Sequence, residues 1–264
     1  MTAALPSAEL LTAAQDAVDL AAGMLRTRLP GVLTAKGDRD MASEVDYAVE
    51  RAVRSFLAER TPDVGFLGEE EGAAGAADGL TWVLDPVDGT VNLVHGIPLV
   101  AVSLGLVLAG TPILGVVDTP FLHRRYHAVR GDGAYADGRP IRASGVSRLA
   151  DAVVAVGDYA VGEDADDKNA DRLAVTGRLV PRVQRVRMLG SAAIDLVWVA
   201  EGRLDALVML ANKPWDTAAG VVIAREAGAQ VVDRTGAPHT MASGETLAGA
   251  PQLLDELLPL VGVR

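Results

Sequence analysis

Residues 80–90 read LTWVLDPVDGT, and this stretch decides the fold class because an apolar run leads directly into two aspartates. The run Leu80–Leu84 is typical of a buried strand, which would deliver Asp85 to the end of that strand. Pro86 fixes its own φ and removes one N–H, so the turn is stiff. Gly89 lets the backbone approach a ligand without a side-chain clash. We therefore expect Asp85 and Asp88 to lie close together beside a buried strand.

Two explanations account for a pair of aspartates at this spacing. Two close carboxylates repel and raise each other's pKa unless a cation lies between them. Oxygen donors without Cys or His nearby favour Mg²⁺ over zinc. Alternatively, Asp85 and Asp88 accept backbone N–H groups in an Asx-type turn. The segment alone leaves both explanations open.

Three more acidic positions stand at the ends of predicted elements. Glu69 follows the predicted strand Val64–Gly68, Asp216 stands at the start of a predicted helix, and Asp46 comes three residues after Ser43. Each has an ordinary explanation: a solvated loop for Glu69, a helix N-cap for Asp216 and a capping box for Asp46. Their joint occurrence with the aspartate pair favours a carboxylate-lined site.

Hydrophobic periodicity predicts a mixture of helices and short strands. The predicted helices are Ser7–Leu29, Ser43–Arg60, Asp164–Gly177, Ser191–Ala200, Thr217–Ala227 and Pro251–Val261. The predicted strands are Val64–Gly68, Leu80–Leu84, Pro98–Leu108, Ile113–Asp118, Arg125–Arg130, Gly133–Ala136, Ala152–Val156, Val183–Val186, Leu204–Met209 and Gln230–Asp233. Several strands are joined as hairpins, which favours a layered α/β or α+β sandwich over a barrel. No segment resembles a long linker, so we expect residues 1–143 and 144–264 to be two halves of one compact unit.

Composition excludes several classes of protein. The 264 residues carry a formal charge of −11 and no cysteine. The missing cysteine excludes thiol nucleophiles, zinc fingers and disulfide frameworks, and the acidity argues against a nucleic-acid partner. Glu9 and Asp16 precede the first basic residue, Arg26, which is the reverse of a secretory signal and predicts a cytoplasmic protein.

One stretch imitates a membrane span, since residues 96–117 contain no charge. Gly110-Thr111-Pro112 interrupts it with turn chemistry. The first half alternates apolar residues with a period of two, which is typical of a strand. We therefore expect two buried strands and no membrane contact.

The sequence resembles the inositol monophosphatase family of Mg²⁺-dependent, lithium-sensitive phosphatases. The resemblance spans about Lys36 to Gly249, and the blocks Asp85–Thr90 and Trp215–Gly220 are its most specific part. The other blocks are Asp40–Asp46, Gly68–Glu70 and, more weakly, Gly190–Ala193. The family fold is an αβαβα sandwich, and its members are commonly homodimers.

The resemblance implies a set of roles for residues of this chain. Two or three Mg²⁺ ions would be held by Glu69, Asp85, Asp88, Asp216 and the carbonyl of Val87. The catalytic set would be Asp46, Thr90 and Glu69, with Asp46 orienting Thr90 to position and help deprotonate the attacking water. The substrate would contact Asp88, Gly89, Thr90, Gly190, Ser191, Ala192 and Asp216.

One position departs from the pattern of the family. Members committed to inositol monophosphate tend to carry an acidic residue about seven positions before the tryptophan-linked aspartate, where it holds sugar hydroxyls. Here that position is Met209, which accepts no such bonds. The resemblance implies hydrolysis of a small phosphomonoester, with inositol 1-phosphate or a related polyol or sugar phosphate expected. Histidinol phosphate, fructose 1,6-bisphosphate and adenosine 3′,5′-bisphosphate remain alternatives.

Other classes fit less well. A haloacid-dehalogenase-type phosphatase needs one residue between its aspartates, whereas Pro86-Val87 places two here. A serine hydrolase would need a Gly-x-Ser-x-Gly elbow, and a nucleotide kinase a Gly-x-x-x-x-Gly-Lys-Ser/Thr loop; neither motif occurs. A metal-binding regulatory protein would be expected to lose Asp46, Glu69 or Thr90, and all three are present. The small-residue loop 72–79 is either a mobile flap beside Glu69 or an idle surface loop.

Overall fold

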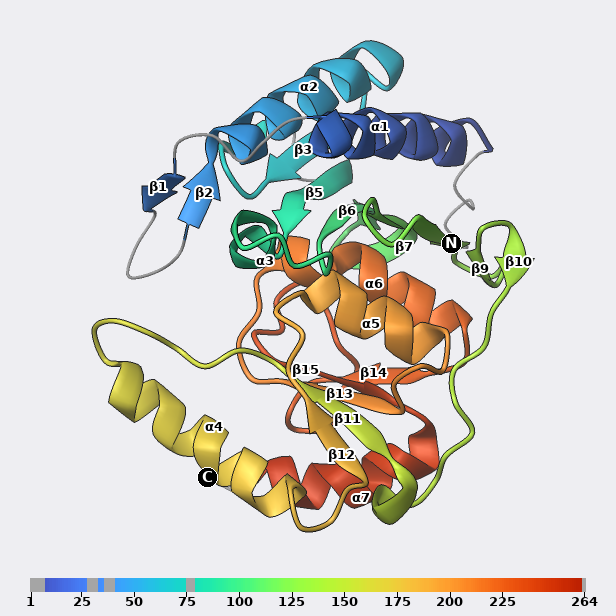
Figure 1. Cartoon of the computed structure of the whole chain (residues 1–264). Helices are drawn as coiled ribbons and strands as arrows, with labels where there is room; N and C mark the ends of the chain where they lie inside the picture. The colour runs from blue at the N-terminus through green and yellow to red at the C-terminus, as the bar shows by residue number, and fades with distance from the viewer. Residues whose placement is uncertain (1–7, 28–32, 36–40, 75–78, 263–264) are drawn as a thin grey trace.

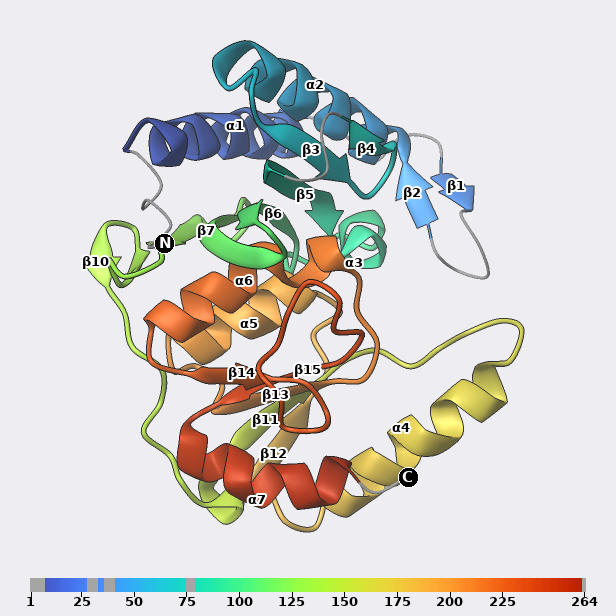
Figure 2. The same cartoon turned by 180° about the vertical axis from the view of Figure 1, so that it is seen from behind.

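The computed structural model describes residues 8–27, 33–35, 41–74 and 79–262, and its helices and sheets are stacked in five layers (Figure 1). Helices α1 and α2 cover an eight-stranded sheet, α5 and α6 form the middle layer, and α4 and α7 cover a five-stranded sheet, as the view from behind also shows (Figure 2). The helices are α1 Ala8–Thr27, α2 Glu44–Arg60, α3 Thr90–Val94, α4 Ala165–Leu179, α5 Ala192–Ala200, α6 Pro214–Glu226 and α7 Pro251–Val261, with a 3₁₀ turn at Leu149–Asp151. The predicted αβαβα sandwich is confirmed.

The larger sheet has the strand order β10-β9-β8-β7-β6-β5-β3-β4, and the smaller one β12-β11-β13-β15-β14. In the larger sheet β3 runs parallel to β5, and in the smaller sheet β11 runs parallel to β12 and β13. The strands of the larger sheet are β3 Gly65–Gly68, β4 Gly72–Ala74, β5 Leu80–Asp88, β6 Ala101–Leu108, β7 Thr111–Thr119, β8 Arg124–Val129, β9 Ala134–Ala136 and β10 Arg139–Pro140. Those of the smaller sheet are β11 Val153–Val156, β12 Arg185–Arg187, β13 Ala206–Met209, β14 Gln230–Val232 and β15 Thr246–Gly249. Strands β1 Leu33–Ala35 and β2 Met41–Ser43 form a separate hairpin.

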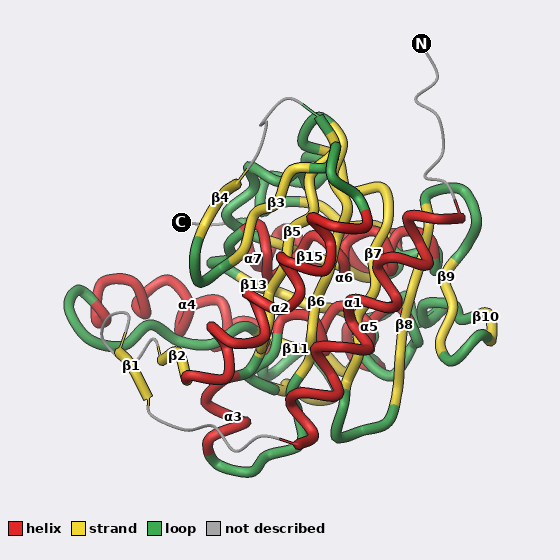
Figure 3. The backbone as a smooth tube through the Cα atoms, turned by 90° about the horizontal axis from the view of Figure 1, so that it is seen from above, coloured by secondary structure: helices red, strands yellow, loops and turns green. Residues whose placement is uncertain are grey.

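The alternation in β6 sorts its side chains between two layers. Val102, Leu104 and Leu106 are buried in the core beneath α1 and α2, which lie across the strands in the view from above (Figure 3). On the opposite face, Gly105 leaves room for α6, because a Cβ there would lie 2.7 Å from the Cβ of Ala218. The uncharged stretch at 96–117 is thus a hairpin of buried strands, as predicted. None of the helices in the described ranges is long and apolar enough to cross a membrane.

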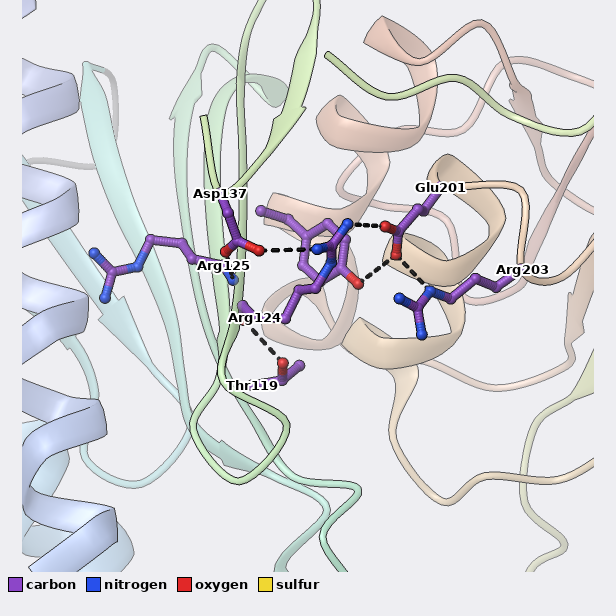
Figure 4. A network of polar contacts seen from close by, with 7 residues as sticks. Thr119, Arg124, Arg125, Asp137, Glu201 and Arg203 are labelled. Atoms are coloured by element: carbon purple, nitrogen blue, oxygen red, sulfur yellow. Dashed lines mark hydrogen bonds and ion pairs between the residues drawn. The ribbon is translucent and has the colours of Figure 1, made fainter. Parts of the chain in front are cut away.

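A polar network joins the larger sheet to the middle helical layer (Figure 4). Glu201, at the end of α5, accepts hydrogen bonds from the hydroxyl of Tyr126 at 2.8 Å and from Nε of Arg203 at 2.6 Å, and it pairs with Arg124 of β8. Arg124 also bonds Asp137 at 2.9 Å. Tyr126 is 1% exposed, so its hydroxyl depends on Glu201 for a partner. The network therefore ties β8 of the larger sheet to the end of α5 in the middle layer.

Residues 246–249 and the start of the loop 72–79 form strands that were not predicted from the sequence. Strand β15, which pairs with both β13 and β14, was not predicted, because its four residues, TLAG, are short and mostly small. Within the loop 72–79, Gly72–Ala74 form β4 at the sheet edge, and residues 75–78, on which the flap hypothesis depends, lie outside the described residues.

We predict that Glu201→Ala lowers the free energy of unfolding by about 2–4 kcal/mol, because it leaves a buried tyrosine hydroxyl and a half-buried arginine without their partner. Asp137→Asn removes the charge of a more exposed partner of the same arginine, keeps an oxygen for the N–H of Arg125, and should cost less than about 1 kcal/mol. Urea unfolding of the two variants beside the wild type measures both values. Equal losses in the two variants would contradict a special role for Glu201.

Candidate active site

Strands β3 and β5 bring the first acidic residues to one edge of the larger sheet. They run parallel with Gly68 paired to Leu84, so Glu69 and Asp85 lie side by side just beyond this pairing. The N–H of Glu69 donates to the carbonyl of Leu84 at 3.2 Å, which keeps the two chains together one residue beyond the pairing. Ligand sites in α/β proteins commonly form at the carboxyl ends of parallel strands.

A bulge in β5 presents the two aspartates. Asp85 pairs with Ser103 and Asp88 with Ala101, so β5 holds one extra residue between these pairs. The N–H of Val87 donates to Oδ1 of Asp85 at 3.0 Å. The Asx-type bond considered from the sequence is therefore present, and Asp85 lines a cavity as well. The two explanations are compatible, because a carboxylate has more lone pairs than one N–H uses.

Asp88 connects this loop to the start of α5. Its carboxylate accepts hydrogen bonds from the Ser191 hydroxyl at 2.5 Å and from the N–H groups of Ala193 at 2.7 Å and Ala192 at 3.2 Å. The N-terminus of a helix favours a negative charge because its N–H groups are unpaired. Of the residues predicted to contact substrate, Ser191 and Ala192 thus hold Asp88 in place.

Gly89 and Asn92 lock the loop against the other half of the chain. Gly89 has φ 94°, and a Cβ there would lie 2.8 Å from the carbonyl oxygen of Leu99, so only glycine fits. Nδ2 of Asn92 donates to the carbonyls of Leu99 at 2.8 Å and Leu189 at 2.9 Å. These hydrogen bonds, which we call the Asn92 clamp, hold Gly190, another predicted substrate residue, against α3. Asn92 lies two residues beyond the block Asp85–Thr90, and the sequence prediction assigned it no role.

Thr90 and Asp46 form the predicted pair. The Thr90 hydroxyl lies 2.9 Å from Oδ1 of Asp46 and 3.1 Å from the carbonyl of Val87. Asp46 is 1% exposed and belongs to the first turn of α2, so two distant segments meet here. The side chain of Ser43, on which the capping-box hypothesis for Asp46 depends, is outside the described residues.

Glu50 supports the turn that carries Glu69, and the sequence prediction overlooked it. Glu50 is fully buried, and its carboxylate accepts the N–H groups of Glu70 at 2.8 Å and Glu71 at 2.9 Å. Arg54 also bonds it at 2.8 Å. Gly68 makes room, since a Cβ there would lie 2.3 Å from the Glu50 carboxylate. The sequence did contain a signal for this role, because Glu50 lies on the buried face of a predicted helix, where a charged residue needs partners.

Asp216 stands in the first turn of α6, and here the sequence prediction was wrong in detail. Helix α6 begins at Pro214, three residues before the predicted start at Thr217, because proline suits the first helical position. Asp216 is therefore the third helical residue rather than the N-cap. Its Oδ2 accepts the N–H of Lys213 at 2.6 Å, and its carboxylate faces the same cavity as Asp85 and Asp88.

A cavity of about 420 Å³, which we name the main cavity, gathers most of the predicted site residues. Those lining it are Glu69, Asp85, Val87, Asp88, Gly89, Thr90, Gly190 and Asp216. Burial, followed by the charges of Glu69, Asp88 and Asp216, holds the pKa of Asp85 well above its usual value. Burial likewise raises the pKa of Asp88 to about 6 and that of Asp216 to about 7. The main cavity is thus a site of concentrated, mutually repelling negative charge.

The donor set of the main cavity fits hard cations. It consists of carboxylates and a backbone carbonyl, which are the ligands that Mg²⁺ and its relatives prefer. A cation among these groups would relieve the repulsion that raises their pKa values. In the described part of the chain, no three acidic or histidine side chains lie close enough together to hold a metal ion without moving.

A second cavity of about 310 Å³, the side cavity, adjoins the main one. The two share Asp88, Asp158, Gly190 and Asp216. Met209, at the position where an acidic residue was expected from the family pattern, lines the side cavity, as do Asp195 and Arg172. A molecule in the main cavity can therefore extend into the side cavity.

Comparison with known proteins agrees with this geometry. The model of the inositol monophosphatase family matches residues 7–261. A probable inositol 1-monophosphatase ImpA of Mycobacterium tuberculosis is 39% identical over 235 residues, covering 89% of this chain and 86% of the relative. Inositol monophosphatase 1 of Solanum lycopersicum is 36% identical over 253 residues, covering 93% and 92%.

Solved structures show the same fold. The suhB protein of Bartonella henselae superposes with a TM-score of 0.90 at 31% identity, over 97% of this chain and 98% of that one. Inositol monophosphatase II of Staphylococcus aureus gives a TM-score of 0.80 at 27% identity, over 95% and 92%. The carboxylate-lined cavity, the sandwich around it and these matches lead to one conclusion: the chain belongs to the inositol monophosphatase family, whose members are enzymes that hydrolyse phosphomonoesters.

Proposed function

We propose that the protein is a Mg²⁺-dependent phosphatase for the monophosphate of a small polyol, with inositol 1-phosphate as the first candidate substrate. The observation that carries the proposal is the main cavity, where the carboxylates of Glu69, Asp85, Asp88 and Asp216 converge from three segments beside the Thr90–Asp46 pair. The relatives named above are inositol monophosphatases, and SaIMPase-II, 28% identical to this chain, has a structure with inositol monophosphate bound.

In this proposal Glu69, Asp85, Asp88, Asp216 and the carbonyl of Val87 hold the cations. Bound Mg²⁺ would acidify a water molecule and offset the negative charge of the phosphate. The chain fixes the ligands beforehand: Glu50 anchors the turn of Glu69, the bulge orients Asp85, and the start of α5 holds Asp88. Positioning and charge neutralisation are what phosphoryl transfer requires of a protein.

The Thr90–Asp46 pair prepares the attacking water. The buried Asp46 carboxylate accepts a hydrogen bond from the Thr90 hydroxyl, which leaves a lone pair of the Thr90 oxygen directed away from Asp46. That lone pair accepts a hydrogen bond from a water molecule at the mouth of the main cavity and so aligns the water oxygen toward the phosphorus atom. Thr90 then acts as the relay through which the water proton reaches Asp46.

Substrate recognition differs from the usual inositol pattern at Met209. This side chain packs against Gly157, where a Cβ would lie 3.0 Å from Cγ of Met209, and it offers no acceptor to a sugar hydroxyl. Related small polyol or sugar monophosphates therefore belong in the same substrate screen. Lithium sensitivity, a homodimer and a cytoplasmic location stay predictions that rest on the family resemblance.

We predict that Thr90→Ala lowers kcat for inositol 1-phosphate by roughly 10²–10⁴, because the proton relay is lost while the carboxylates are unchanged. Thr90→Ser keeps the hydroxyl and should retain activity within about tenfold. Phosphate release at saturating Mg²⁺ measures both variants. Wild-type turnover in Thr90→Ala would reduce Thr90 to a structural residue of α3.

We predict that activity requires Mg²⁺ and disappears in Asp85→Asn, because this change removes a ligand charge from the centre of the main cavity. Treatment of the wild type with a chelator should abolish phosphate release, and added Mg²⁺ should restore it. Isothermal titration with Mg²⁺ separates lost binding from lost chemistry. Full activity of Asp85→Asn would overturn the metal assignment.

We predict that Glu50→Gln lowers the free energy of unfolding by about 1–3 kcal/mol, because an amide NH₂ would face one of two backbone N–H groups. The displaced Glu69 turn should also raise the Mg²⁺ concentration needed for half-maximal activity. Glu71→Gln makes the same chemical change at a more exposed position and should alter neither property. Unchanged Mg²⁺ dependence in Glu50→Gln would contradict the supporting role.

A further inference from the structure

A buried carboxylate in the side cavity lacks a partner. Asp195, in the first turn of α5, is 2% exposed, and its Oδ1 is enclosed without a hydrogen bond. Asp88, which faces the same helix start, receives three hydrogen bonds. Buried polar groups in folded proteins are normally hydrogen-bonded, and each exception calls for an explanation. Since Asp195 lines the side cavity, the explanation we consider is a ligand.

The surroundings of Asp195 do not stabilise its charge. The nearby charges that act on it, Asp88 and Asp158, are both negative, and together with burial they hold the pKa of Asp195 well above its usual value. Arg172, a cation lining the side cavity, directs Nη1 to the backbone carbonyl of Asp158 at 2.9 Å. The fold thus keeps an acceptor in the side cavity at a cost in stability.

The two cavities meet at Asp88, Gly190 and Asp216. A phosphate ester bound with its phosphate in the main cavity would therefore extend its alcohol portion past these residues into the side cavity. Met209 lines that cavity without offering an acceptor for a hydroxyl, whereas Asp195 does offer one.

We propose that Asp195 is a specificity-determining residue, whose carboxylate accepts a hydrogen bond from a hydroxyl group on the alcohol portion of the substrate. This inference rests on the proposed phosphatase function and names the substrate class of the same site. Met209 offers no hydrogen-bond acceptor to a substrate hydroxyl. Asp195, from the adjacent helix α5, supplies one in its place.

The chemistry of the side cavity defines the class of alcohol. The Ser191 hydroxyl is already donated to Asp88 and the Tyr159 hydroxyl to Thr176. Asp195 therefore keeps an acceptor for a donor on the occupant, while the Arg172 guanidinium lines the same cavity as a cation. The hydroxyl groups of a polyhydroxylated ring or chain supply such donors.

The test compares two esters that share a ring and differ in its hydroxyl groups: inositol 1-phosphate and cyclohexyl phosphate. With Mg²⁺ present, wild type should prefer the inositol ester in kcat/KM by at least about tenfold. Asp195→Leu should raise KM for inositol 1-phosphate by about 10- to 100-fold and leave that for cyclohexyl phosphate within about threefold. An equal loss for both esters would overturn the proposal.

Two further variants guard against a structural or a charge effect. Asp195→Asn keeps the shape and one acceptor oxygen, so it should lose about 3- to 10-fold for the inositol ester. Asp158→Asn also alters the charge of the cavity but leaves the Asp195 acceptor in place, so any change should fall equally on the two esters, because a charge effect acts on the phosphate that both share. A selective loss for the inositol ester in Asp158→Asn equal to that in Asp195→Asn would overturn the hydrogen-bond assignment in favour of general charge.

Stability gives an independent measure. Because Asp195 is buried without a partner, Asp195→Leu should leave the Tm of the protein without Mg²⁺ unchanged or raise it by a few degrees. A fall in Tm would assign Asp195 a structural role instead. Histidinol phosphate tests an ammonium donor: if it is the preferred ester and Asp195→Asn abolishes that preference, the hydroxyl class is wrong. Absence of phosphate release from every ester would overturn the proposed function itself.

Discussion

The site depends on one set of hydrogen bonds, those between the Asp88 carboxylate and the start of α5. They join residues more than a hundred positions apart in the chain, and they tie the bulged end of β5 to the middle helical layer. Without them Asp88 would be a buried, unpaired charge beside Asp85, and the loop bearing Gly89 and Thr90 would lose its anchor. The Asn92 clamp acts in the same place, since it holds the chain just before α5 against α3. The main cavity is therefore formed between the larger sheet and the middle helical layer, and not by the sheet alone.

Most of the fold was predictable because its information is local. The period of two in β6 and the glycine turn after it identify a buried hairpin even though the stretch is uncharged enough to imitate a membrane span. The exceptions are elements whose stability comes from neighbours. Strand β15 has no pattern of its own, and its place between β13 and β14 is what makes it a strand. The start of α6 was misplaced because Pro214 suits a first helical turn as well as a loop.

For the site, the sequence pattern identified carboxylates that line the main cavity and missed the groups that hold the neighbouring loops. Glu69, Asp85, Asp88 and Asp216 stand at element ends, where carboxylates are conspicuous, and the main cavity gathers them. Glu50 and Asn92 were overlooked because their partners are backbone groups on distant segments. Asp195 was overlooked for the opposite reason: an aspartate in the first turn of a helix is ordinary. Its unpaired state appears only when burial and hydrogen bonds are known.

The distribution of hydrogen bonds among the buried carboxylates separates support from recognition. Glu50 and Asp88 each receive several donors, so their charges are held in place before any ligand arrives. Asp195 receives none at Oδ1, although it lies on the same helix as the groups that satisfy Asp88. A fold selected for stability alone would place an apolar side chain there, as it does at Met209 across the same cavity. The retained carboxylate is therefore best explained by a donor that arrives from outside the chain, and its position between α5 and the shared wall of the cavities makes the alcohol portion of the substrate that donor.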